Sequence, residues 1–260
     1  ELERPAAEMK LNGLGIRMDH VSFAYRQEDG EVLHDVNLDI QPGTVTALVG
    51  PSGSGKSTIA KLIAGFWDVT GGSVALGGVN LRKIPLEQLN RQIAYVSQDN
   101  YLFNRSIREN IRMGRPSATD AEVEQAGKQS GCDAFIRKLD NGYDTVVGSA
   151  GSHLSGGERQ RISIARALLK KPKVLILDDS TSAVDMATDA KIRRAFATEL
   201  KKTTKIIIAQ RIASVCDADQ IIVMDDGKIS AVGKHEDLME NSEIYRDVYL
   251  SQQEGGNIDG

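Results

Sequence analysis

The sequence has 260 residues, of which 40% are hydrophobic and 26% charged, and its formal net charge is −4. These values are typical of a globular chain with one large domain or two small ones. The negative charge argues against sequence-independent nucleic-acid binding, which needs a basic surface. No apolar run approaches the roughly 18 residues of a transmembrane helix. Cys132 and Cys216 show no metal-ligand spacing, and we expect both to be reduced thiols.

The first part of the chain reads as short strands around one glycine-rich loop. Residues 1–12 are polar and lack periodicity, so we expect a linker that follows an upstream segment. Apolar residues alternate from Ile16 to Tyr25, which predicts a strand, and a second strand precedes "QPG". The apolar strand "TVTALVG" then leads through a glycine-rich loop into the helix "STIAKLIAGF". A small strand-and-turn region, "GGSVALGGVNL", and the strand "IAYVSQ" follow.

The second part is helical at first and then alternates between helices and strands. Residues from about Ser106 to Asp140 read as helices, within an all-helical insertion at about 100–150. The alternating elements are a helix at 156–169, a strand at 174–177, a helix at 188–201, strands at 205–209 and 220–224, a hairpin turn at 225–228 and two short helices. This order predicts an α/β fold, a parallel sheet with helices on both faces. Residues 253–260 are expected to be a frayed tail.

One loop has the composition of a phosphate cradle. The stretch "GPSGSGKST" fits G-x-x-x-x-G-K-S/T and lies between an apolar strand and a helix, the context that this motif requires. Glycines let backbone N–H groups turn toward an anion, and the helix adds its positive N-terminal end. We expect Lys56 to reach the β- and γ-phosphates of a nucleotide and Ser57 to coordinate Mg²⁺. The candidate binding residues are Gly50, Ser52, Gly53, Ser54, Gly55, Lys56, Ser57 and Thr58.

A carboxylate follows the most apolar strand. Asp178 ends the run "VLIL", at the carboxyl end of a predicted parallel strand, where α/β folds place ligand groups. We expect it to orient Mg²⁺ opposite Ser57, through water. The alternative is a buried carboxylate that caps the next loop.

A second glycine motif opens a helix. In "LSGGERQR", Ser155 and Glu158 have the spacing of a capping box, an ordinary helix start. The adjacent Gly156 and Gly157 expose backbone N–H groups at a positive helix end, which favours an anion. Because another loop already supplies the chain's own phosphate site, we expect this motif to serve a nucleotide bound elsewhere.

In chain order, "GPSGSGKST", "YVSQDNYLF", "LSGGERQR", "LILDD" and "SAVD" resemble the nucleotide-binding domain of ATP-binding cassette (ABC) transporters. The resemblance covers roughly residues 14–250 and implies a domain at 13–252. It implies a P-loop NTPase parallel sheet core with an N-terminal antiparallel β subdomain and the helical insertion. In this family two cassettes sandwich two molecules of ATP with Mg²⁺. Ser155, Gly156 and Gly157 would then contact the γ-phosphate of ATP held by a partner cassette.

Other roles follow from the resemblance alone. Tyr25 matches the aromatic residue that stacks on adenine, although it could be an ordinary strand aromatic. Gln98 matches the glutamine that senses Mg²⁺ and the attacking water, and Asp185 matches a loop that crosses the dimer interface. The stretch "NYLFNRSIRENI" resembles the exporter branch, in which this region meets the transmembrane domains. The implied partners are a second cassette and transmembrane domains, without nucleic acid, at the cytoplasmic face of the inner cell membrane.

Two positions depart from the family pattern. Asp179 stands where the family has a glutamate that positions or deprotonates the attacking water, and it is one methylene, about 1.5 Å, shorter. A misplacement near 1 Å can cost about 100-fold in rate. Gln210 stands where the family has a histidine that contacts the γ-phosphate, and an amide cannot become cationic. The pair predicts a site that retains ATP and hydrolyses it poorly, as in one subunit of a heterodimeric exporter with a competent partner.

Three other functions remain open from the sequence. The first is the ATPase subunit of an importer, although importers usually lack the "LFNRSIRENI" pattern. The second is a soluble ABC protein of DNA repair or translation, which would carry a long coiled coil or two cassettes. The interval between Lys56 and Ser155 shows no heptad run, and the chain has one cassette. The third is a nucleotide-binding regulatory module without turnover.

Overall fold

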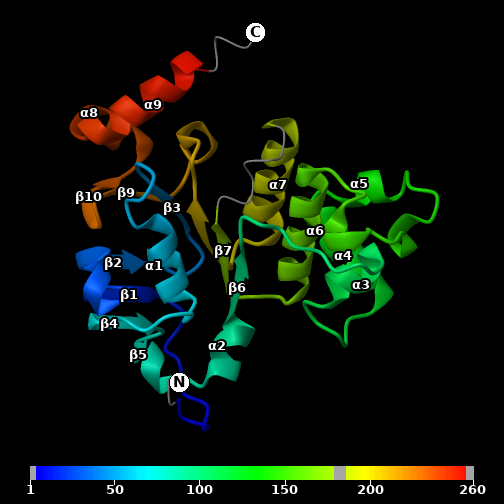
Figure 1. Ribbon diagram of the computed structural model, residues 1–260, viewed down its shortest axis with the longest axis horizontal. Coiled ribbons are helices and arrows are strands. Elements are labelled where there is room, and N and C mark those ends of the chain that lie inside the picture. Colours follow the sequence, from blue (N-terminus) through cyan, green and yellow to red (C-terminus); the bar gives the residue numbers. More distant parts are fainter. Residues whose placement is uncertain (1–3, 179–185, 256–260) are drawn as a thin grey trace. The chain divides into compact units, whose positions relative to one another are not determined.

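The computed structural model describes residues 4–178 and 186–255 (Figure 1). The chain divides into two units, which are described separately. Unit 1 comprises Glu1–Ile93 and Lys202–Gly260, and unit 2 comprises Ala94–Lys201. The predicted positions of Asp179 and Asp185 lie outside the described residues. No helix among the described residues is long and apolar enough to cross a membrane.

The antiparallel sheet of unit 1 has the strand order β2-β1-β4-β5. Its strands are β1 (Ile16–Phe23), β2 (Leu33–Ile40), β4 (Gly71–Leu76) and β5 (Val79–Asn80). Ile16 of β1 pairs with Ile40 on one side and with Leu76 on the other. Buried Ile16 and Met18 alternate with exposed residues, so one face of the strand is apolar. This sheet is the N-terminal antiparallel β subdomain that the family resemblance implies.

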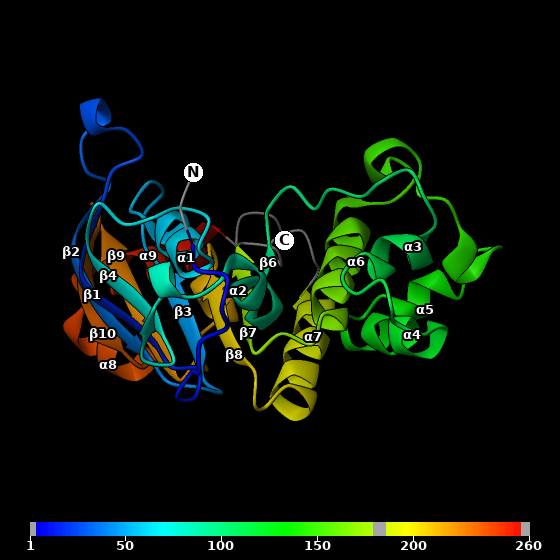
Figure 2. The ribbon, with the colours of Figure 1, turned by 90° about the horizontal axis from the view of Figure 1, so that it is seen from below.

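The parallel strands of unit 1 surround β3 (Val45–Val49). β3 lies between β8 (Thr204–Ile208) and β9 (Gln220–Asp225), parallel to both, and β10 (Lys228–Gly233) pairs antiparallel with β9 (Figure 2). The central strands are mostly buried and mostly apolar: β3 reads VTALV and β8 ends in three buried isoleucines, as expected of strands covered on both faces. Helix α1 (Lys56–Ile63) follows β3 and buries Ile59, Leu62 and Ile63. The strand–loop–helix context predicted for the phosphate cradle is therefore confirmed.

Unit 1 contains three further described helices, one that was not predicted from the sequence and two that were. Helix α2 (Leu86–Gln92) was not predicted, because seven residues are too few to show a helical period. Helices α8 (His235–Asn241) and α9 (Glu243–Gly255) are the two predicted at the C-terminus. The predicted tail at 253–260 is wrong at its start, because α9 continues through residue 255.

The predicted linker is tied to unit 1 although it has no helix or strand between residues 4 and 12. The buried amide of Gln88 accepts a hydrogen bond from the N–H of Met9 at 2.9 Å and donates one to its carbonyl at 2.8 Å. The guanidinium of Arg4 donates to the carbonyl of Leu81 at 2.8 Å. These contacts hold the segment against the sheet-and-helix unit that follows it.

Unit 2 is largely helical. It contains most of β6 (Ile93–Val96), its neighbour β7 (Val174–Asp178), and helices α3 (Ile107–Arg112), α4 (Asp120–Gln129), α5 (Asp133–Ile136), α6 (Gly156–Leu169) and α7 (Met186–Glu199). Apolar side chains of α3 to α6 form one core, which includes Ile107, Val123, Ile136 and Ile162. The predicted insertion at 100–150 is helical except for loops and one antiparallel bridge, between Ser106 and Val146.

Candidate nucleotide-binding site

The loop between β3 and α1 contains one glycine position with no room for a side chain and another that is open to solvent. At Gly50, with φ of 144°, an added Cβ would lie 2.2 Å from the carbonyl oxygen of Met224. At Gly53, with φ of 77°, an added Cβ would meet nothing within 4 Å. The loop is thus packed tightly on its inner side and open on its outer side, which lets a ligand approach backbone N–H groups closely.

Polar groups of this loop suit a polyphosphate. The ammonium group of Lys56 donates to the carbonyl oxygens of Gly50 at 2.7 Å and Pro51 at 3.0 Å, so it lies over the loop itself. The hydroxyl of Ser54 is buried and has no hydrogen-bond partner among the described residues. A buried polar atom without a partner is costly unless a ligand or water satisfies it. Ser57, the second residue of α1, presents a hard oxygen of the kind that Mg²⁺ prefers.

Tyr25 lies beside this loop, just after β1 rather than within it. Its hydroxyl forms a 2.9 Å hydrogen bond with Oγ1 of Thr58, on the first turn of α1. Its ring makes edge-to-face contacts with Phe23 and Trp67, at centroid distances of 4.8 and 5.2 Å. Tyr25 is 38% exposed, so it is accessible to a base that could stack on its ring. The sequence did not identify Trp67 as its neighbour, and a lone tryptophan after a helix was the only available signal.

Gln210 follows β8 and is exposed. Its carbonyl accepts a hydrogen bond from the side-chain amide of Gln252, and the Oε1 of Gln252 accepts another from the N–H of Ile212 at 2.9 Å. The side chain of Gln252 on α9 is therefore hydrogen-bonded to the backbone of Gln210 and of Ile212, on either side of Arg211. The sequence assigned no role to Gln252, because nothing local links residues so far apart in the chain.

The predicted metal carboxylate lies in unit 2. Asp178 is the last residue of β7 and is 5% exposed. The hydroxyl of Tyr95, on β6, donates a hydrogen bond to its Oδ2. Gln98 lies in the loop after β6 with an exposed side chain, and its carbonyl accepts from Asn100 at 2.9 Å.

The second glycine motif of unit 2 has the predicted capping geometry. Ser155 is the N-cap of α6; its hydroxyl accepts from the N–H of Glu158 at 3.2 Å, and the Glu158 carboxylate accepts from the N–H of Ser155 at 3.0 Å. Gly156 and Gly157 are the first two residues of this 14-residue helix and are partly exposed. The helix therefore begins with backbone N–H groups that no bulky side chain covers.

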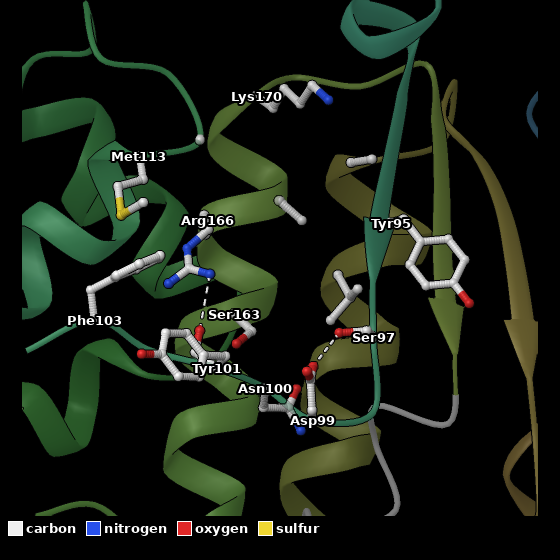
Figure 3. A pocket seen from close by; sticks show the side chains of 14 residues that line it. Tyr95, Ser97, Asp99, Asn100, Tyr101, Phe103, Met113, Ser163, Arg166 and Lys170 are labelled. Atoms are coloured by element: carbon white, nitrogen blue, oxygen red, sulfur yellow. Dashed lines mark hydrogen bonds between the residues drawn. The ribbon is translucent and has the colours of Figure 1, made fainter. Parts of the chain in front are cut away.

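A cavity of about 560 Å³ opens on unit 2 beside β6 and α6 (Figure 3). Its apolar wall contains Tyr101 and Phe103, whose rings meet edge to face at 5.1 Å, and Met113. Arg166 of α6 also lines it and donates to the carbonyl oxygens of Asn110 at 3.0 Å and Tyr101 at 3.2 Å. Much of this wall comes from the stretch with the exporter-type pattern.

The charged groups that line this cavity are the cations of Arg166 and Lys170 and the carboxylate of Asp99, which accepts a hydrogen bond from the hydroxyl of Ser97. Burial lowers the pKa of the Arg166 guanidinium and that of the Lys170 ammonium group, because a charged group loses hydration there. Both groups line the cavity. An occupant that combines apolar side chains with polar groups would suit such a mixed lining.

A family model and two relatives match this chain over more than half of its length. The family model described as "ABC transporter" matches residues 33–182. A Staphylococcus aureus (strain NCTC 8325) protein named for multidrug export as an ATP-binding/permease protein is 43% identical over 237 residues, which are 91% of this chain and 41% of that protein. The Bacillus subtilis protein YgaD, named in the same way, is 41% identical over 238 residues, 92% of this chain and 41% of that protein.

A solved structure agrees with these matches. The structure of a bacterial Atm1-family ABC exporter with ATP bound has a TM-score of 0.93 and 37% identity, covering 97% of this chain and 45% of that one. The chain spans about two fifths of the length of the curated relatives. With the phosphate loop, the Asp178 strand end and the Ser155 helix start in their predicted elements, the chain belongs to the ABC transporter family as a nucleotide-binding domain.

Proposed function

We propose that this chain binds and hydrolyses ATP to power export by transmembrane domains at the cytoplasmic face of a membrane. The observation that carries the proposal is the loop at Gly50–Thr58, with an open outer side, the Lys56 ammonium over its carbonyls and an unpartnered buried hydroxyl at Ser54. Export, rather than import or a soluble role, is supported by the names of the relatives.

Each part of the loop has a task in binding. The Lys56 ammonium would exchange its carbonyl partners for the β- and γ-phosphates, and the open backbone near Gly53 would donate N–H groups to them. Tyr25 would stack on adenine, with its ring oriented by Thr58 and Trp67. This arrangement fixes the base and the phosphates from within unit 1.

Magnesium would be held by hard oxygen ligands. When bound, Mg²⁺ neutralises charge that develops on the transferring phosphoryl group. The hydroxyl of Ser57, the carboxylate of Asp178 and the amide of Gln98 are the proposed ligands, directly or through water. The proposal that these three groups bind the same ion is based on the resemblance of their sequence motifs to those of the family.

We further propose that the chain's own site hydrolyses ATP weakly and that it pairs with a competent cassette. The support is the aspartate at 179 and the neutral amide of Gln210, each in place of a better hydrolytic group. Ser155, Gly156 and Gly157 would complete the partner's site with a hydroxyl and free N–H groups. The cavity beside β6 and α6 would receive a segment of a transmembrane domain.

Binding can be tested on the 260-residue chain through Trp67, its only tryptophan. MgATP should change the emission of Trp67 in a saturable way, because the indole contacts Tyr25. Lys56→Ala should weaken ATP binding by about 10- to 100-fold, since a hydrogen bond to a charged group contributes roughly 1.5–3 kcal/mol.

Lys61→Ala is the matched control, because Lys61 lies in the last turn of the same helix. It should leave the affinity for ATP unchanged. Equal affinity of the Lys56 variant and the unaltered chain would remove the phosphate-loop assignment.

A further inference from the structure

Tyr95 contacts the carboxylate to which the proposed function assigns the metal. It lies on β6, between the buried residues Ala94 and Val96, and its hydroxyl donates to Oδ2 of Asp178 on the neighbouring strand β7. Figure 3 shows its ring turned away from the other side chains of the cavity. We infer that Tyr95 is a positioning residue for Asp178, and that it sets the metal affinity of this site. The inference rests on the proposed role of Asp178 as a magnesium ligand.

A hydrogen bond from a neutral hydroxyl to a carboxylate orients the acid without cancelling its charge. The bond occupies one lone pair of Oδ2 and limits rotation of the carboxyl group, so the remaining oxygen lone pairs point in set directions. An arginine or lysine partner would also orient the group, but would oppose a cation. The tyrosine donor itself adds no positive charge beside the carboxylate.

Burial makes this orientation matter. Asp178 is 5% exposed, so little water can substitute for a missing donor. Groups that hydrogen-bond to metal ligands typically account for about 10- to 100-fold in metal affinity. Removing the hydroxyl oxygen of Tyr95 should therefore weaken metal binding, while every residue of the phosphate loop is kept.

The test is Tyr95→Phe in the full chain, with two separate titrations. Mn²⁺, an ion that replaces Mg²⁺ and is detected by electron paramagnetic resonance, is titrated in the presence of ATP. We expect half-saturation to need about 10- to 100-fold more Mn²⁺. ATP binding in EDTA, followed through Trp67, should be unchanged, which also establishes that the variant is folded.

Tyr143→Phe is the matched control. The hydroxyl of Tyr143 donates to Oδ1 of Asp133 at 2.6 Å, so the variant removes the same kind of bond elsewhere in unit 2. Its Mn²⁺ titration should match that of the unaltered protein. A second variant, Tyr95→His, keeps a ring with an N–H donor and should retain more metal affinity than Tyr95→Phe.

Two outcomes separate this inference from the proposed function. In the first, the Tyr95 variants need no more Mn²⁺ for half-saturation than the unaltered protein, whereas Asp178→Asn needs much more. Tyr95 then does not position the carboxylate. In the second, Asp178→Asn also leaves Mn²⁺ half-saturation unchanged, and the metal-ligand role of Asp178 is itself wrong.

Discussion

At the scale of single residues, we propose that two side chains limit how fast this site hydrolyses ATP. Asp179 keeps the charge of the usual glutamate but is about 1.5 Å shorter, and Gln210 cannot carry a positive charge. Gln252 holds the backbone around Gln210, so a substitution of the Gln210 side chain starts from a positioned loop.

Restoring both groups should therefore speed hydrolysis. Asp179→Glu with Gln210→His is expected to raise turnover at this site by about 100-fold, the cost of a misplacement near 1 Å. The measurement is ATP hydrolysis by the assembled transporter, with the partner's own site inactivated. Gln253→His, one residue beyond Gln252 and exposed, adds a histidine outside the site and should have no effect. If the double variant hydrolyses ATP no faster, reach and charge at these two positions do not limit the rate.

At the scale of elements, three helices in the described part of unit 2 begin in the same way. Capping boxes join Ser106 to Glu109 at α3, Thr119 to Glu122 at α4 and Ser155 to Glu158 at α6. Each satisfies two backbone N–H groups that would otherwise lack partners. We propose that only the last also serves a nucleotide, that of the partner cassette.

This difference separates structure from function. Ser155→Ala and Thr119→Ala should each lower the free energy of unfolding by about 1 kcal/mol, the usual cost of losing an N-cap. Only Ser155→Ala should also weaken ATP-dependent association of the two cassettes, because its hydroxyl would touch the γ-phosphate. Chemical denaturation measures the free energy of unfolding, and sedimentation in the analytical ultracentrifuge measures the association of the two cassettes. Equal association by both variants would leave α6 with an ordinary helix start.

At the scale of the whole molecule, the chain is expected to bind ATP well and to use it slowly alone. The 260-residue chain should bind MgATP yet show little hydrolysis. A competent partner cassette should raise the rate, because we propose that each site is completed by a helix start from the other chain. Steady-state hydrolysis with and without the partner measures this. Brisk turnover by a purified monomer would contradict both the weakened site and its dependence on a partner.

Most elements could be predicted because their signals are local. Apolar runs predicted β3 and β7, and the glycine loop with Lys56 predicted the start of α1. The predicted helix at 156–169 has the bounds of α6, since its cap forms between residues three positions apart. The predicted start of the tail was wrong because α9 continues to Gly255. The last residue of a helix has only a weak local signal in the sequence.

What the sequence by itself determined was most of the strands, the phosphate loop, the capped glycine helix and the family to which these motifs belong. Only the tertiary structure decided which distant side chains support them. Tyr95 reaches Asp178, Gln252 holds the loop of Gln210, and Trp67 meets Tyr25. The physical reason is that hydrophobic period and capping act over a few residues, whereas these contacts exist only after the strands and helices have packed.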